Sequence, residues 1–173
     1  MNPVLLSLLL LLPTAPPVKE EVETVIRAKE LPASSLALLN PWIQQATDVR
    51  YFRETDGQSR SYEIKFWLDG ARWSVEFDAD GTYNDTEIER SFSELPPDVA
   101  ESVRSELGKR FDKFSIRRIQ EQYLTWPPEI GTPSGFELTV EGTSSQELGV
   151  FEFNTDARGN LLRERRVIEI PDL

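Results

Sequence analysis

The stretch from Tyr62 to Glu89, YEIKFWLDGARWSVEFDADGTYNDTEIE, decides the fold. Its first run places Tyr62, Ile64 and Phe66 on one side of an extended chain, because successive side chains of a β-strand point to opposite faces. The run from Trp73 to Asp78 alternates in the same way, and glycine-containing turns separate the runs. The pattern therefore predicts an antiparallel meander with one buried face.

The composition limits the classes of function. The chain has 173 residues and a formal net charge of −11, which argues against binding nucleic acid or an anionic membrane surface. It contains neither Cys nor His, which excludes disulfides, thiol nucleophiles, Cys/His zinc sites and Ser-His-Asp triads. We expect no cofactor and no membrane insertion of the mature chain.

The N-terminus indicates export. Val4 to Leu12 is an apolar run broken by Ser7, and a Pro-Thr-Ala-Pro-Pro segment follows it. Residues 1–17 therefore resemble a signal peptide or hydrophobic leader, since a bilayer span needs about 20 apolar residues. We expect a periplasmic or secreted protein, and the alternative is a chain anchored by an uncleaved N-terminal segment.

An internal repeat follows from two similar halves. Glu30-Leu31-Pro32 recurs as Glu94-Leu95-Pro96, and a helical pattern followed by alternating strand patterns comes after each. A single amphipathic helix buries its apolar stripe against one face of a sheet. The predicted fold class is therefore α+β, with two tandem repeats, residues 18–94 and 95–173, each an amphipathic helix packed on an antiparallel β-meander sheet.

The order of these segments resembles that of the PepSY-like domain family, including the β-lactamase-inhibitor-like group of exported bacterial proteins. The resemblance rests on Leu-Pro before an amphipathic helix, on Tyr-Glu-Ile-Lys-Phe, and on Val-Glu-Phe-Asp-Ala-Asp-Gly, and it covers two copies between Glu23 and Ile170. It implies a helix on an antiparallel sheet, an extracytoplasmic location, and binding or inhibition of a partner protein. It brings no catalytic residues.

The acidic hairpin around Asp78 and Asp80 is one candidate site. Carboxylate oxygens suit Ca²⁺, and a pair of carboxyl groups facing each other can hydrolyse glycosides. A calcium-binding protein or a carboxylate-dependent hydrolase is therefore the alternative function. The second hairpin reads Phe-Asn-Thr-Asp-Ala-Arg-Gly, with Asn154 aligned to the first acid, and this substitution favours a turn requirement over a ligand set.

Exposed aromatic side chains are the other candidate site. Trp67 alternates with the buried positions and shares its face with Glu63 and Lys65, while Trp126 lies in a Pro- and Gly-rich insertion. We expect Trp67, Trp126, Lys65 and Glu63 to bind a partner, whereas Trp42 and Trp73 are expected in the core. The sequence thus predicts an exported, non-enzymatic protein that binds an extracytoplasmic protein.

Overall fold

The computed structural model describes residues 17–19, 21–144 and 147–167. In these residues two α-helices and two short 3₁₀ turns interrupt a series of β-strands. The elements are β1 (Val18–Lys19), β2 (Glu21–Ile26), η1 (Ala28–Glu30), α1 (Ala33–Ile43), β3 (Thr47–Asp56), β4 (Ser59–Leu68), β5 (Ala71–Asp78), β6 (Tyr83–Glu89), η2 (Phe92–Glu94), α2 (Pro97–Gly108), β7 (Lys113–Tyr123), β8 (Gly135–Ser144), β9 (Glu147–Asp156) and β10 (Leu161–Val167).

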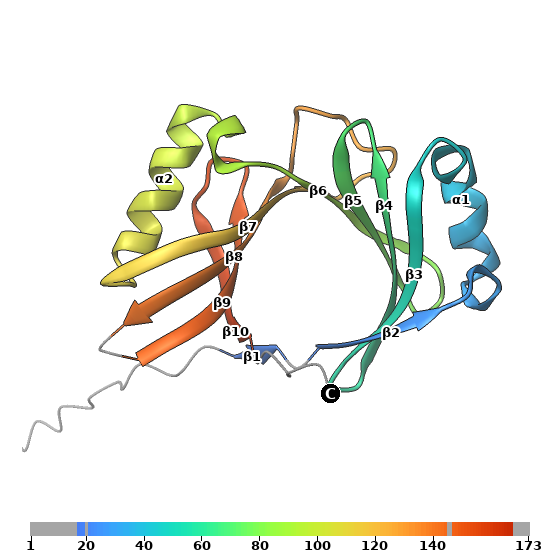
Figure 1. Ribbon diagram of the computed structural model, residues 1–173, viewed down its shortest axis with the longest axis horizontal. Helices are drawn as coiled ribbons and strands as arrows, with labels where there is room; N and C mark the ends of the chain where they lie inside the picture. Colours follow the sequence, from blue (N-terminus) through green and yellow to red (C-terminus); the bar gives the residue numbers. More distant parts are fainter. Residues whose placement is uncertain (1–16, 20, 145–146, 168–173) are drawn as a thin grey trace, which may run out of the picture.

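The strands form one sheet that curves into a nearly closed ring (Figure 1). Their order is β1-β10-β9-β8-β7-β6-β5-β4-β3-β2, and β6 pairs with β7 to join the two halves of the chain. The ring closes through the N-terminal segment, because β1 pairs in parallel with β10 while β2 pairs antiparallel with β3. One short segment of chain thus connects the two edges of the sheet.

This continuous sheet corrects the predicted fold class. The α+β arrangement of two helix-on-sheet repeats is wrong, because the described strands belong to one ten-stranded sheet with two helices outside it. The order of one helix followed by four antiparallel strands does occur twice, as α1 with β3 to β6 and α2 with β7 to β10. Hydrogen bonding between β6 and β7 continues the ladder across the expected boundary, which local sequence patterns cannot reveal.

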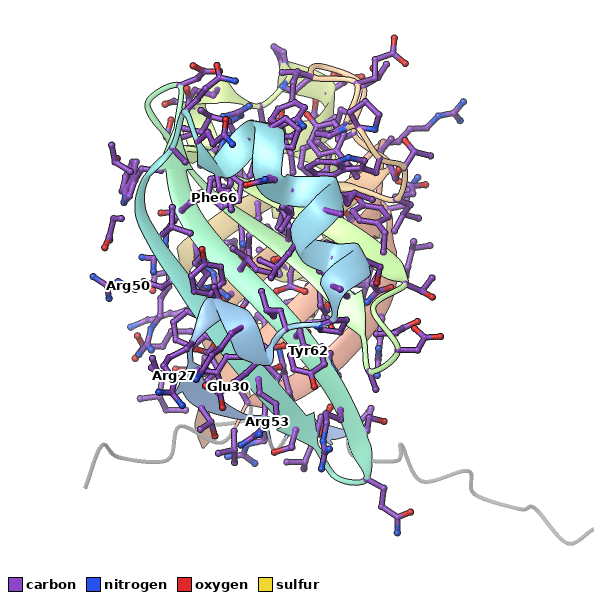
Figure 2. All side chains as sticks on the ribbon, turned by 90° about the vertical axis from the view of Figure 1, so that its right-hand side faces the viewer. Arg27, Glu30, Arg50, Arg53, Tyr62 and Phe66 are labelled. Atoms are coloured by element: carbon purple, nitrogen blue, oxygen red, sulfur yellow. The ribbon has the colours of Figure 1, made fainter. Side chains whose placement is uncertain are left out.

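The hydrophobic core lies between the helices and the outer face of the ring, in two clusters. In the first cluster Leu39 of α1 meets Ile64, Phe66 and Val75 of the sheet, and each of these side chains is at most 1% exposed. In Figure 2 α1 lies across β4, the strand that carries Tyr62 and Phe66. Burial of each such side chain stabilises the fold by about 1.5–3 kcal/mol.

The second cluster lies under α2 and has the same organisation. Val99, Val103 and Leu107 form the buried stripe of α2, and they pack against apolar side chains of β7, β8 and β9. Because apolar and polar residues alternate along these strands, burying one set on the outer face turns the polar set toward the inside of the ring. The predicted alternation of Tyr62 to Phe66 therefore produces a polar inner face.

Two hairpin turns pack against the beginnings of the helices. Gly81 has φ +85° and a Cβ there would come within 2.6 Å of Pro32, just before α1. Gly159 has φ +79° and approaches Val99 in α2. In both turns a glycine N–H donates to an aspartate carbonyl three residues earlier, Asp78 in one and Asp156 in the other. The alignment of Asn154 with the first acid is thus wrong, because Asp156 occupies that position.

The predicted leader, residues 1–17, lies outside the described residues except for its last position. In the described part of the chain, neither helix has the length and apolarity that crossing a membrane requires.

Candidate functional site

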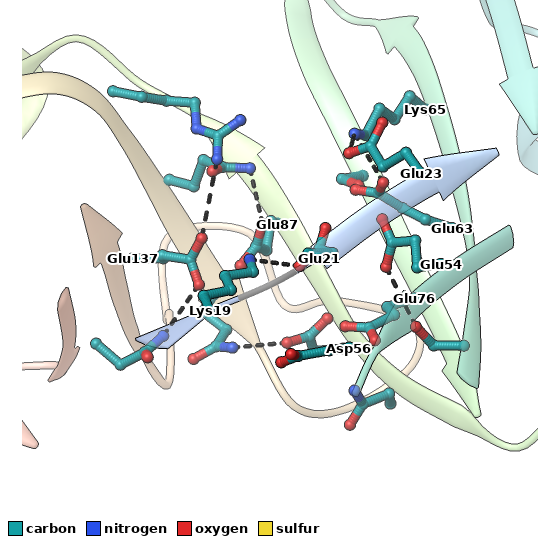
Figure 3. Close-up of a pocket in the computed structure, with 18 of the residues that line it drawn as sticks. Lys19, Glu21, Glu23, Glu54, Asp56, Glu63, Lys65, Glu76, Glu87 and Glu137 are labelled. Carbon is teal, nitrogen blue, oxygen red and sulfur yellow. Dashed lines mark hydrogen bonds and ion pairs between the residues drawn. The ribbon is translucent and has the colours of Figure 1, made fainter. Parts of the chain in front are cut away.

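The inner face of the ring surrounds a polar cavity of about 750 Å³ (Figure 3). Strands from both halves of the chain contribute side chains to it, so neither half forms it alone. Among the described residues, eleven carboxyl and eight cationic side chains line it, namely Glu21, Glu23, Glu54, Asp56, Glu63, Glu76, Asp78, Asp85, Glu87, Glu89 and Glu137 with Lys19, Arg60, Lys65, Arg72, Arg117, Arg118, Arg163 and Arg165.

A row of carboxyl groups crosses the floor of this cavity. Glu63 of β4 lies directly opposite Glu76 of β5, and Glu76 lies directly opposite Asp85 of β6. Like charges at such cross-strand positions repel one another and destabilise a sheet. The row therefore concentrates acidic groups at a cost to the stability of the folded protein.

Burial shifts the proton equilibrium of Asp85. Its residue is 7% exposed, and burial together with the charge of Glu76 raises the pKa of Asp85 to about 7. Gln122 of β7 donates a hydrogen bond of 2.6 Å to the carboxylate and opposes part of this rise. The side chain consequently changes charge near neutral pH, far above the ordinary range of an aspartate.

Glu54 and Glu63 form a carboxyl pair whose two pKa values are shifted in opposite directions. Burial and the hydrogen bond with Glu63 raise the pKa of Glu54 to about 10, so Glu54 holds a proton at neutral pH. Burial also opposes ionisation of Glu63, but the hydrogen bond with Glu54 and the nearby Lys65 charge keep the pKa of Glu63 below its ordinary value. The two carboxyl groups thus share one negative charge.

Glu87 is the central carboxyl group of the floor. Burial and the charges of Glu137 and Asp85 raise the pKa of Glu87 well above its ordinary value. Gln120 of β7 donates a hydrogen bond of 2.8 Å to it. Burial and the charge of Glu152 also raise the pKa of Glu137 on β8.

Two of the cations, Lys19 and Arg165, lie where the ring closes. Lys19 of β1 forms ion pairs of 2.6 Å with Glu21 and 2.7 Å with Glu152. Arg165 of β10 also pairs with Glu152 and reaches Asp56 of β3 at 3.5 Å. These pairs neutralise the buried Glu152. They also connect β3, β9 and β10 with the N-terminal segment and thereby stabilise the closure of the ring.

One group of acids comes close enough to suggest a metal site. Among the described residues, Glu21, Glu23 and Glu54 place carboxylate oxygens within 4.8 Å of one another. Lys19 already pairs with Glu21, and Lys65 pairs with Glu23 at 2.7 Å. Glu54 holds a proton at neutral pH because of its raised pKa. Lys19, Lys65 and the proton on Glu54 therefore already neutralise most of the negative charge that would bind a divalent ion.

The structure brings three of the four predicted partner-binding residues together. Glu63 and Lys65 line the cavity and pair at 2.7 Å, and Trp67, 45% exposed, follows them on the same face of β4. Trp67 lies opposite the cavity-lining Arg72. Trp126 lies apart on the outer face, in ring contact with Trp42 and Tyr83 at centroid distances of 5.2 and 5.7 Å.

The predicted acidic hairpin has a structural explanation. Asp78 and Asp80 are exposed at the tip, and Asp80 accepts a hydrogen bond of 2.9 Å from the backbone N–H of Thr82. This bond lowers the pKa of Asp80, which makes the group a poor proton donor for hydrolysis. Among the described residues, neither aspartate belongs to a group of three potential metal ligands.

Sequence reasoning missed several residues of the cavity, among them Glu54, Gln120 and Glu137. Gln120 and Glu137 each follow an apolar residue that is buried in the core, so their side chains had to face away from it. Glu54 carried no such signal, because both of its chain neighbours are polar. Lys19 carried no periodic signal either, because its role depends on ring closure.

Comparison with known proteins shows the fold. No protein-family model matches the sequence, and no curated protein matches it. A BLIP-like protein from Bacteroides fragilis is 22% identical with a TM-score of 0.54, over 82% of this chain and 91% of that chain. A DUF2874 family protein from Bacteroides ovatus is 14% identical with a TM-score of 0.57, over 82% of this chain and 94% of that chain.

A candidate periplasmic protein from Bacteroides eggerthii has 14% identity and a TM-score of 0.55, over 79% of this chain and 88% of that chain. The periplasmic location expected from the leader agrees with that description. At these identities the likeness concerns the arrangement of the strands and helices, and this chain has the fold of these BLIP-like and DUF2874 proteins.

Proposed function

We propose that this chain is a non-catalytic periplasmic binding protein whose partner, an extracytoplasmic protein, docks at the ring cavity and is inhibited or modulated by it. The observation that carries the proposal is the cavity itself, about 750 Å³ in volume and lined by charged side chains from both halves of the chain. A large, preformed concave surface is typical of a binding site, and polar groups placed in such a site give it specificity.

Trp67 supplies a point of attachment beside this cavity. Its side chain is 45% exposed on the same face as Glu63 and Lys65. Tryptophan is among the residue types that most often contribute a large share of the binding energy at protein interfaces. We therefore propose that Trp67 packs against the partner, while Glu63 and Lys65 form the charged surface next to it.

The structurally similar proteins support a non-catalytic binding function. One is described as BLIP-like and another as a candidate periplasmic protein, and the resemblance to the PepSY-like family implies binding or inhibition of a partner. Such likeness is an argument from analogy, so the proposal depends on the cavity.

Capture from a periplasmic extract of the native organism tests the proposal. The immobilised protein, a Trp67→Ala variant and a Glu101→Gln control with its change on the exposed face of α2 would be compared by mass spectrometry. We expect a protein that the original chain and the control retain and that Trp67→Ala loses. If every retained protein binds all three chains equally, the cavity side of β4 is not the docking surface.

A further inference from the structure

The centre of the cavity floor holds carboxyl groups that form no ion pair among the described residues, although the charge of Arg118 attracts Glu87 without forming one. Glu76, Asp85 and Glu87 lie on β5 and β6, and within the described residues no Lys or Arg forms an ion pair with any of them. Asp85 and Glu87 are two positions apart on one strand, so they share a face at a spacing of about 7 Å. A positive group between them would contact both.

Gln120 independently points to a missing hydrogen-bond donor. The residue is 6% exposed and lines the cavity, where its Nε2 donates to Glu87. Its Oε1 is buried and has no hydrogen-bond partner. An unpaired buried acceptor costs about 1–3 kcal/mol, and native structures contain few of them. The Gln120 oxygen is thus an open acceptor beside the central carboxyl group.

The spacing of these acceptors does not suit a metal ion. Carboxylate ligands of one cation must bring their oxygens close together, and among the described residues only Glu21, Glu23 and Glu54 do so within 4.8 Å. Asp85, Glu87 and Glu76 belong to no such group. An organic cation with N–H donors reaches acceptors that are farther apart, because each hydrogen bond adds about 2.8 Å on its own side.

We propose that the floor of the ring cavity binds a primary ammonium group, with Asp85 and Glu87 as its charge partners and Gln120 Oε1 as a further acceptor. An ammonium carries three donors and no acceptor, which matches a site made of acceptors. The group belongs to a lysine side chain or to a free diamine. The inference deepens the proposed function and rests on it in taking the cavity as the binding site, since a partner's lysine is one source of the ammonium.

Calorimetric titration of the purified chain at pH 8 and low ionic strength tests the site. The probes are 1,5-diaminopentane, an acetylated Gly-Lys-Gly amide, and tetramethylammonium, which has the charge but no N–H donor. We expect saturable binding of the diamine, the peptide or both, with one site per chain. Binding of the diamine alone would identify a free amine as the ligand, and binding of the peptide would identify a lysine side chain.

Variants locate the site within the cavity. Glu87→Gln should weaken binding about tenfold or more, because it removes a charge-assisted hydrogen bond. Gln120→Met should weaken it severalfold, whereas Glu101→Gln on the exposed face of α2 should leave it unchanged. Equal affinity for tetramethylammonium, equal affinity in Glu87→Gln, or no detectable binding of either amine would overturn the proposal.

The result of the amine titration does not depend on the result of the partner-capture experiment. Amine binding by the purified chain without any Trp67-dependent partner in the extract would remove the proposed function and keep the ammonium site. A captured partner without amine binding would keep the proposed function and remove the ammonium site.

Discussion

Replacing Asp85 with asparagine should stabilise the protein at alkaline pH and leave its stability unchanged in acid. The side chain is buried on β6, opposite Glu76, and the pKa of Asp85 is raised from 3.8 to about 7. A folded-state pKa above the unfolded one means that folding favours the protonated acid. Stability is therefore lost as the pH rises from about 4 to about 7. Asparagine cannot ionise and avoids this loss.

The expected size follows from the shift. About three pKa units at 1.36 kcal/mol each correspond to roughly 4 kcal/mol of unfolding free energy at pH 8. After burial, the charge of Glu76 contributes most to the raised pKa of Asp85, and the charges of Glu137 and Glu63 contribute less. Gln122 donates a hydrogen bond that the amide oxygen of an asparagine at this position could also accept. The gain corresponds to a melting temperature higher by about 10 °C at pH 8.

Urea unfolding followed by tryptophan fluorescence at pH 4, 6 and 8 measures the effect. The difference between Asp85→Asn and the original chain should be near zero at pH 4 and largest at pH 8. Asp112→Asn, at an exposed position, provides the matched control and should show no such trend. A difference that stays constant from pH 4 to pH 8 would refute the reasoning, because the cost of burying this charge would then be absent.

Three further predictions concern Arg165 where the ring closes, Gly135 in the sheet and Trp67 beside the cavity. Arg165→Ala should destabilise the fold by about 1.5–3 kcal/mol in urea unfolding, since it removes a charge-assisted hydrogen bond from the 2% exposed Glu152, which keeps its ion pair with Lys19. Arg158→Ala, in an exposed turn, should cost little. Gly135→Ala should cost about 1–3 kcal/mol by thermal unfolding, because the new Cβ would lie 2.0 Å from a carbonyl oxygen of β9; an unchanged melting temperature would mean that the strands separate easily there. Trp67→Ala should change the melting temperature by less than about 3 °C, and a larger loss would mark Trp67 as part of the core.

Local patterns in the sequence were enough to predict strands, hairpins and the buried faces. Ile64, Phe66, Trp73, Val75 and Phe77 are all at most 4% exposed, as their alternation predicts. The prediction that Trp73 lies in the core is confirmed. Alternation is a local property of the backbone, so a single sequence reveals it. The prediction of two tandem copies stays a prediction.

The candidate site was predicted only in part. The alternation of β4 places Glu63 and Lys65 on the face of Trp67, and the structure puts both residues in the cavity. Asp78 and Asp80 belong to a dense acidic stretch of the sequence, which predicted a site there, yet a turn explains their geometry. Trp126 had no partner in its own segment, but Trp42 and Tyr83 contact it from other segments.

The sequence by itself determined which side chains are buried and which strands are neighbours through hairpins, because both depend on residues close together in the chain. The tertiary structure decided that the strands join into one ring, since β6 meets β7 and the N-terminal segment contacts β10 as well as β3. Once the apolar faces pack outward under two helices, the remaining polar face must turn inward. Residues as far apart as Glu54 and Glu137 thereby line one cavity, whose low solvent exposure shifts their proton equilibria.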